Sequence, residues 1–121
     1  MSIEIETRLG DQLARYLDLA TSEAKLTAAN MANIDTPGYK AVGMDFEAEM
    51  QQAMADVNQG RAARQVRLKG VEGTISRPDG NNVSLDRESL NLAEAQLKFK
   101  VGVALLRGEN QRLMDAIHAD K

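Results

Sequence analysis

The single histidine of the chain, His118, is the first residue to consider for acid–base or metal chemistry, because Asp115 and Asp120 lie close to it in the sequence. An imidazole beside a carboxylate can transfer protons or bind a metal ion. A histidine near the C-terminal end of a helix also interacts favourably with the negative end of the helix dipole. The position of His118 at the end of a predicted helix favours this second role, in which the side chain is exposed and neither catalytic nor metal-binding.

The other carboxylates do not form a catalytic or metal-binding pattern either. Residues 79–82, Asp-Gly-Asn-Asn, offer oxygen ligands but lack the alternating spacing and closing glutamate of a calcium-binding loop, so they predict a turn. Glu47 and Glu49 are two residues apart, as are Glu4 and Glu6, and side chains at this spacing diverge on a helix. The sequence has no phosphate-binding glycine loop, nucleophile elbow or cysteine–histidine cluster. We therefore predict a protein that is not an enzyme, with no catalytic residue, cofactor or metal site.

The composition favours a single helical domain, residues 1–121. Apolar residues make up 43% of the chain but aromatic residues only 3%, so a core of aliphatic side chains and methionine is expected, which suits helix packing. The absence of cysteine excludes disulfides and thiolate chemistry, and no apolar run approaches the ~20 residues that a membrane span needs. The acidic N-terminal sequence lacks the layout of a cleavable signal peptide. This fits both a cytoplasmic protein and one exported through a dedicated secretion channel.

The net charge of −3 conceals an asymmetry along the chain. Residues 1–60 contain four lysines and arginines against ten acidic residues, whereas residues 61–121 contain eleven against eight. The basic excess is too small, and aromatic residues too few, for a nucleic-acid surface. Two interpretations remain. The basic middle segment is an ordinary solvated loop, or it packs against the acidic N-terminal part of another copy, as head-to-tail assembly would require.

Residues 9–33 predict the first long helix. Its apolar positions recur every three or four residues, the spacing of a coiled coil. They are Leu13, Leu17, Ala20, Ala24, Ala28 and Met31. A helix of this length, roughly 37 Å at 1.5 Å per residue, cannot bury its apolar stripe by itself, so it needs a partner.

Residues 34–44 predict a turn followed by an extended segment. Asn33 can close the preceding helix in the left-handed conformation. Pro37 and Gly38 suit the central positions of a type II turn, because the second position requires a positive φ. The chain from Tyr39 onwards then leaves the turn in an extended conformation.

The middle of the chain predicts a short helix and then irregular structure. Residues 45–58 form the helix, with Asp45 as its N-cap. Its apolar face consists of Phe46, Met50 and Met54. Residues 59–83 predict a weakly ordered loop with short strands at 66–69 and 74–76.

Residues 84–118 predict the longest helix, capped by Ser84 or Asp86. It carries two apolar stripes, so it must contact neighbours on more than one side. The first stripe is Leu90, Ala93, Leu97, Val101, Ala104 and Gly108; the second is Leu92, Phe99, Val103, Leu106, Leu113 and Ile117. Gly102 and Gly108 weaken the helix unless they permit the close approach of a packed backbone. The predicted fold is mainly α, with the N- and C-terminal helices forming a coiled-coil pair.

Several stretches of the chain resemble the flagellar axial proteins, the family of rod, hook and hook-associated subunits, and among them the proximal rod type. Residues 29–40, Ala-Asn-Met-Ala-Asn-Ile-Asp-Thr-Pro-Gly-Tyr-Lys, are similar to the family's N-terminal motif, and 41–47 to its continuation. Residues 80–88 resemble the segment that leads into the C-terminal helix, and the stretches at 97–100, 105–106 and 114–117 resemble parts of that helix.

This resemblance implies a structural subunit of the flagellar basal-body rod, the drive shaft that transmits motor torque across the periplasm. Such subunits are exported by the flagellar type III apparatus without a cleaved signal peptide. The implied partners are further copies of the chain, an adjacent rod protein of the FlgC type, the basal-body adaptor of the FliE type and the inner-membrane ring. The alternative is a cytoplasmic coiled-coil adaptor or regulator that self-associates through the same stripes.

Within a rod, the apolar stripes would pack against neighbouring subunits and the Pro37–Gly38 turn would reach another copy. Asn30 and Asn33 would make polar contacts that fix the register; for Asn33, simple closure of the helix is an equally good explanation. The predicted interface residues are Leu13, Leu17, Ala24, Asn30, Met31, Asn33, Pro37, Gly38, Tyr39, Leu97, Val101, Ala104 and Leu106.

Overall fold

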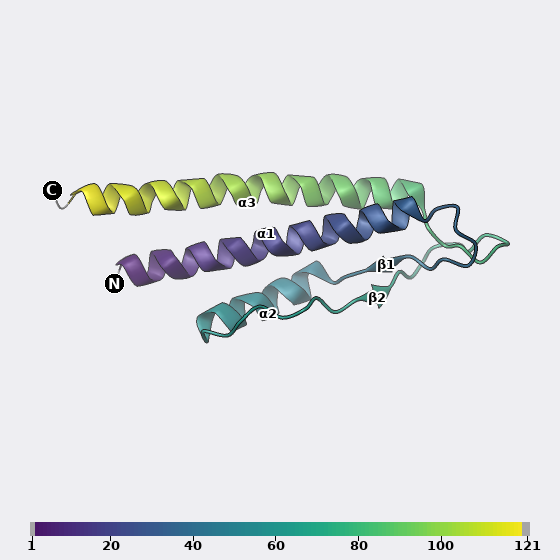
Figure 1. The fold of residues 1–121 in the computed structure, drawn as a ribbon, viewed down its shortest axis with the longest axis horizontal. Coiled ribbons are helices and arrows are strands. Elements are labelled where there is room, and N and C mark those ends of the chain that lie inside the picture. The colour runs from purple at the N-terminus through teal and green to yellow at the C-terminus, as the bar shows by residue number, and fades with distance from the viewer. Residues whose placement is uncertain (1, 120–121) are drawn as a thin grey trace.

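The computed structural model describes the backbone of residues 2–119 and the side chains of residues 7–119. The elements in chain order are helix α1 (Ser2–Ala32), strand β1 (Val42–Gly43), helix α2 (Phe46–Asn58), strand β2 (Lys69–Gly70) and helix α3 (Leu85–Ala119). The three helices lie side by side in an elongated molecule, with α1 between α3 and α2 (Figure 1). The two chain ends lie at one end of the molecule, and the segments that follow α1 and precede α3 lie at the other (Figure 1). The mainly helical fold with two long terminal helices is therefore confirmed.

Helix α1 begins earlier than the sequence predicted, at Ser2 rather than at residue 9. The apolar stripe does not extend to residues before 9, so it did not indicate that residues 2–8 are helical.

Helix α3 packs antiparallel to α1 along one face with a strict period of seven residues. Its buried residues are Glu88, Ala95, Gly102 and Glu109. A seven-residue period spans two helical turns and is the repeat of a coiled-coil seam. We call this line of four residues, together with the α1 side chains that it contacts, the α1–α3 seam.

Gly102 is the point of closest approach in the α1–α3 seam. A Cβ atom at this position would lie 2.6 Å from Leu17 Cδ2 and 3.0 Å from Tyr16 Cδ2. The close approach predicted for Gly102 is thus confirmed. At Gly108 the same hypothesis finds no partner within the described chain, because none of its atoms lies within 4 Å of the Cβ position there.

The two glycines should therefore respond oppositely to substitution. Gly102→Val should lower the free energy of unfolding by about 2–3 kcal/mol, because the branched side chain forces α1 and α3 apart. Gly108→Ala should raise it by about 1 kcal/mol, because the helix gains propensity without a clash. Urea unfolding of the purified chain followed by circular dichroism measures both, and changes of the same sign would contradict the packing described here.

Helix α2 packs on the opposite side of α1 through an aromatic contact. The rings of Tyr16 and Phe46 meet edge to face, with centroids 5.6 Å apart. The Nζ atom of Lys98 lies 3.8 Å from the centroid of the Phe46 ring and 3.0 Å from Glu23 Oε1. This lysine from α3 thereby links all three helices. Asp45 caps α2 as predicted, accepting a hydrogen bond from the backbone N–H of Ala48 at 3.0 Å.

The predicted strands are largely wrong. The strand expected at 66–69 is reduced to β2, Lys69–Gly70, and residues 74–76 form none. Strand β2 pairs antiparallel with β1, so that Val42 lies opposite Gly70. Strand β1 lies in the segment predicted to be extended, but its pairing was not predicted, because two residues are too few to show an alternating pattern.

Candidate functional site: the assembly surface

The turn after α1 begins with Asn33, whose predicted left-handed conformation is wrong, because glycines alone have a positive φ among residues 2–119. Asn33 closes the helix with its side chain instead. Its Nδ2 donates to the carbonyl oxygen of Ala29 at 2.8 Å, and its Oδ1 accepts a hydrogen bond from the Thr36 hydroxyl at 3.0 Å. The type II turn at Pro37–Gly38 is confirmed by the φ of Gly38, +76°, and by the Tyr39 N–H, which donates to the Thr36 carbonyl at 3.2 Å.

Asn30 joins the end of α1 to three other parts of the chain. Its Nδ2 donates to the Val42 carbonyl at 2.8 Å and to Glu88 Oε1 at 3.0 Å. Its Oδ1 accepts from the Tyr39 hydroxyl and from the Val42 N–H, both at 3.0 Å. An asparagine amide has two donor hydrogens and two acceptor lone pairs, so Asn30, which is 2% exposed, uses its full capacity within the chain. We propose that it serves assembly by fixing the position of β1 and α3, rather than by touching another subunit.

Asn81 is completely buried and lies in the segment that precedes α3, from which its side chain binds the end of α1. Its Nδ2 donates to the carbonyl oxygens of Asn33, Ile34 and Thr36 at 2.9–3.0 Å. Its Oδ1 accepts a hydrogen bond from the Val83 N–H at 2.8 Å. One side chain therefore satisfies carbonyl groups that the end of a helix leaves without partners.

The neighbours of Asn81 complete this junction. The turn predicted at 79–82 lies two residues earlier, at 77–80, where the Gly80 N–H donates to the Arg77 carbonyl at 2.8 Å, and the Asp79 side chain continues it by accepting from the Asn81 N–H at 2.9 Å. Arg77 donates to the carbonyl oxygens of Ile34 and Val83. Asn82 Oδ1 accepts from the backbone N–H of Ala41 at 2.6 Å. The sequence predicted the turn but not its role, although two consecutive asparagines after a glycine are a recognisable signal for backbone-binding side chains.

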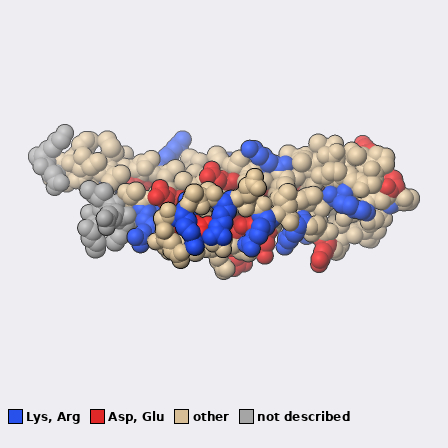
Figure 2. Space-filling view, turned by 60° about the horizontal axis from the view of Figure 1, so that its bottom comes forward, with Lys and Arg blue, Asp and Glu red and all other residues tan. Residues whose placement is uncertain are grey.

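The arginines of the basic segment after α2 form ion pairs within the chain. Arg61 Nε and Arg64 Nη2 lie 3.0 and 2.9 Å from Asp56 Oδ1, and Arg67 Nε lies 3.3 Å from Glu49 Oε1. Figure 2 shows basic and acidic side chains alternating across this face. Both earlier interpretations of the charge asymmetry were therefore incomplete, because acidic residues of the first half pair with basic residues of the second half inside one copy.

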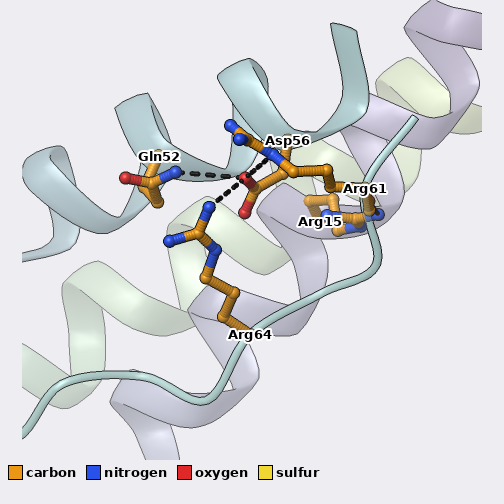
Figure 3. Close-up of polar contacts among 5 residues, drawn as sticks. All are labelled: Arg15, Gln52, Asp56, Arg61 and Arg64. Atoms are coloured by element: carbon orange, nitrogen blue, oxygen red, sulfur yellow. Dashed lines mark hydrogen bonds and ion pairs between the residues drawn. The ribbon is translucent and has the colours of Figure 1, made fainter. Parts of the chain in front are cut away.

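Asp56 is the centre of this ion-pair cluster (Figure 3). Burial alone would raise the pKa of its carboxyl group, but several partners outweigh that effect. These are the hydrogen bonds from Gln52 and Arg64 and the positive charges of Arg64 and Arg61, and together they hold the pKa below its ordinary value. Arg15 also belongs to the cluster, because its Nη2 donates to the Arg61 carbonyl at 3.0 Å. The cluster thus fastens the segment after α2 to both α2 and α1.

This lowered pKa makes the contribution of Asp56 to stability depend on pH. The contribution is complete above the ordinary pKa of aspartate and is lost as the pH falls through the lowered value. The difference in unfolding free energy between the natural chain and Asp56→Asn should thus be largest at neutral pH and shrink below about pH 4. Urea titrations of both proteins between about pH 2 and 7 test this, and a difference that is independent of pH would contradict it.

The two faces of α3 differ in what covers them. The line of buried residues that contains Gly102 belongs to the α1–α3 seam and faces α1. The first apolar stripe predicted from the sequence lies about 100–180° away around the helix, and all of its members are exposed. Leu97 is 63% exposed and Val101 44%. We call this stripe the outer face of α3; it comprises Leu90, Ala93, Leu97, Val101, Ala104 and Gly108.

The other predicted interface residues lie in three different settings. On the outer face are Leu97, Val101 and Ala104, and at the exposed turn are Pro37 and Gly38. Half-buried within the chain are Leu13, Leu17, Ala24, Met31, Asn33, Tyr39 and Leu106, whereas Asn30 is buried. Leu17 lies against the Gly102 backbone, so part of the α1 stripe is already used inside one subunit.

The residues considered for catalysis or metal binding do not lie together in one site. His118 is exposed in the last turn of α3. Glu47 is exposed whereas Glu49 is buried, so the two carboxylates diverge as predicted. Among the side chains of residues 7–119, no three histidines, aspartates or glutamates are placed to hold a metal ion. No helix within residues 2–119 is long and apolar enough to span a membrane.

Several proteins of known identity are similar to this chain over most of its length. The chain is 34% identical to the flagellar basal body rod protein FlgB of Cereibacter sphaeroides, and the alignment covers 94% of this chain and 99% of that protein. It is 30% identical to FlgB of Yersinia ruckeri, over 84% and 87% of the two chains. It is 28% identical to FlgB of Escherichia coli (strain K12), over 85% and 88%. No family model matches the chain.

Proposed function

The chain belongs to the family of the flagellar basal body rod protein FlgB, and on this premise we propose that the whole chain acts as one subunit of the proximal rod. It is a structural subunit of the flagellar basal-body rod. Membership of a family of rod proteins implies that it is not an enzyme. The similar proteins described above are rod proteins, and they give no support to a cytoplasmic adaptor.

The outer face of α3 is the observation that carries the proposed mechanism. This face is apolar over about five helical turns and exposed in the single chain. Contiguous exposed apolar surface on a soluble chain marks a protein–protein contact. In a rod subunit the natural occupant is an adjacent subunit, which would bury Leu97, Val101 and Ala104. Torque would then pass from subunit to subunit through packed helices.

The polar junction at the other end of the molecule supports a second contact. Asn30 and Asn81 hold the Pro37–Gly38 turn and the end of α1 in one fixed arrangement. Pro37 and Gly38 themselves are exposed. A rigid, exposed turn at the end of a helical pair is suited to meet the next subunit in the rod. The proposed partners are other copies of the chain, a rod protein of the FlgC type, an adaptor of the FliE type and the inner-membrane ring.

The proposed location is the periplasmic part of the basal body, reached by flagellar type III export without a cleaved signal peptide. An in-frame deletion in the organism that encodes the chain tests the function. Cells without hooks, filaments and swimming, all restored by a plasmid copy, are expected. Swimming cells with normal flagella by electron microscopy would contradict the proposal, once a second gene copy is excluded by sequencing.

A further inference from the structure

A pocket lies where α1, α3 and the β1–β2 pair meet. Its volume is about 560 Å³, within the range of about 300–1,000 Å³ that ligand pockets have. Leu26, Met44 and Val71 give it apolar walls, and Glu88 and Asn91 line it from the first turns of α3. This combination suits a long side chain with an apolar stem and a charged end.

Glu88 contributes a carboxylate that the chain satisfies only in part. The residue is 1% exposed, and its Oε1 accepts a hydrogen bond from Asn30 at 3.0 Å. Its Oε2 is buried and has no hydrogen-bond partner among the described residues. Burial raises the pKa of this carboxyl group, although the neighbouring Asn30, Thr27 and Arg87 oppose the shift. A buried carboxylate is unfavourable unless it gains donors or a positive charge, so the pocket lacks a cationic donor.

The basic residues of the pocket do not supply this donor. Arg87 and Lys69 both line it, but Arg87 Nη1 donates to the Glu72 carbonyl at 3.0 Å. Glu88 forms no ion pair with the side chains of residues 7–119. The carboxylates of the same residues are not placed to hold a metal ion. A single cationic side chain from outside the chain is therefore the ligand that fits.

Lys100 is a cation of this kind on the surface that the proposed function assigns to subunit contacts. It lies three residues after Leu97 and four before Ala104, so it borders the outer face of α3. It is exposed and forms no ion pair among residues 7–119. It follows Glu88 by twelve residues of helix, about 18 Å, so it cannot reach the pocket of its own chain. Identical subunits that meet through two different surfaces form open helical arrays, which a rod requires.

We propose that the pocket binds the Lys100 side chain of an adjacent copy, whose ammonium group donates a hydrogen bond to Glu88 Oε2. The methylene stem of the lysine would cover the apolar walls of the pocket. One charged group that must meet one pocket also fixes how the outer face of α3 is aligned on its neighbour. This inference rests on the proposed function, because it needs adjacent copies of the chain.

Chemical cross-linking in isolated basal bodies tests the contact. The chain has no cysteine, so Asn91→Cys/Ala104→Cys places one thiol in the pocket wall and one beside Lys100, while Lys100 and Glu88 remain. A short bismaleimide should produce a band of doubled mass on a denaturing gel. A link within one chain leaves the mass unchanged, so this band reports two joined chains.

Asn91→Cys/Asn110→Cys is the control for the cross-linking experiment, because Asn110 is an exposed residue of α3 away from the outer face. It should give chains of single mass only. Equal cross-linking by the two pairs, or none by Asn91→Cys/Ala104→Cys in basal bodies that contain the chain, would overturn the pocket contact. Absence of the chain from basal bodies would instead contradict the proposed rod function.

Removing either charge tests the ion pair itself. In Glu88→Gln the amide oxygen can still accept the bond from Asn30, so the melting temperature of the purified chain should not fall. Cells with Glu88→Gln or Lys100→Gln as their sole copy should carry fewer complete flagella. Glu94→Gln, at an exposed position of α3, should leave flagella normal.

Lys69→Gln separates the proposed donor from the basic residue of the same pocket, and flagella should stay normal in this variant. Normal flagella with Lys100→Gln would overturn the assignment of the donor, and loss of flagella with Lys69→Gln would do the same. A lower melting temperature of Glu88→Gln would assign its defect to folding and would also overturn the proposal.

Discussion

Replacing Asn30 by alanine should lower the free energy of unfolding by about 3–5 kcal/mol. The substitution leaves four groups without their partner: the Tyr39 hydroxyl, the N–H and C=O of Val42, and Glu88 Oε1. A buried polar group that loses its hydrogen bond costs about 1–3 kcal/mol, and water reaches only some of these groups through the space left by the side chain. Chemical unfolding of the purified protein measures the loss.

Asn33→Ala is the matched control for this experiment. It makes the same chemical change three residues later, where the side chain bonds only to the Ala29 carbonyl and the Thr36 hydroxyl in exposed surroundings. Its loss should be about 1 kcal/mol. Equal losses at the two positions would show that Asn30 is not the centre of the junction.

Val101→Asp should abolish swimming while leaving the folded chain intact. The side chain lies on the outer face of α3 and is 44% exposed. Valine and aspartate have similar helix propensities, so the unfolding free energy should change by no more than about 0.5 kcal/mol. If a neighbouring subunit covers this position in the rod, a carboxylate there would be buried without a partner, which is strongly unfavourable. Soft-agar swimming, electron microscopy of basal bodies and assay of the secreted protein together measure the effect.

Gln96→Asp provides the control for Val101→Asp. It introduces the same charge at an exposed position of α3 outside the apolar stripe, and swimming should persist. The exported variant should be found in the periplasm of cells that carry Val101→Asp, because the substitution affects assembly and not export. Normal rods with Val101→Asp would refute the outer face as an assembly surface.

The elements that depend on periodic patterns could be predicted from the sequence. The long helix at the C-terminal end, the Asp45 N-cap of α2 and the turn at Pro37–Gly38 are local signals, and the structure contains all three. The first stripe of α3 was identified because it repeats every three or four residues, and it remains exposed in the folded chain.

The contacts between distant parts of the chain could not be predicted in the same way. The bonds from Asn81 to the end of α1 and from Arg64 to Asp56 depend on how the chain returns past α2. A sequence shows that these residues are polar but not which partner the fold brings to them. The second stripe of α3 was only partly right. Four of its members, Leu92, Val103, Leu106 and Leu113, are half-buried, but Phe99 and Ile117 are exposed, and the fully buried positions include Glu88 and Glu109.

The proposed mechanism requires that a neighbouring subunit covers the outer face of α3 in the assembled rod. The chain has no cysteine, so Leu97→Cys provides a single thiol at a position that is 63% exposed in the free chain. In motile cells that carry this variant, the thiol should react with a maleimide in the purified chain but be protected in isolated basal bodies. A Gln96→Cys thiol should react in both. Equal labelling of the cysteine at position 97 in the free chain and in the basal body would contradict the proposed assembly surface.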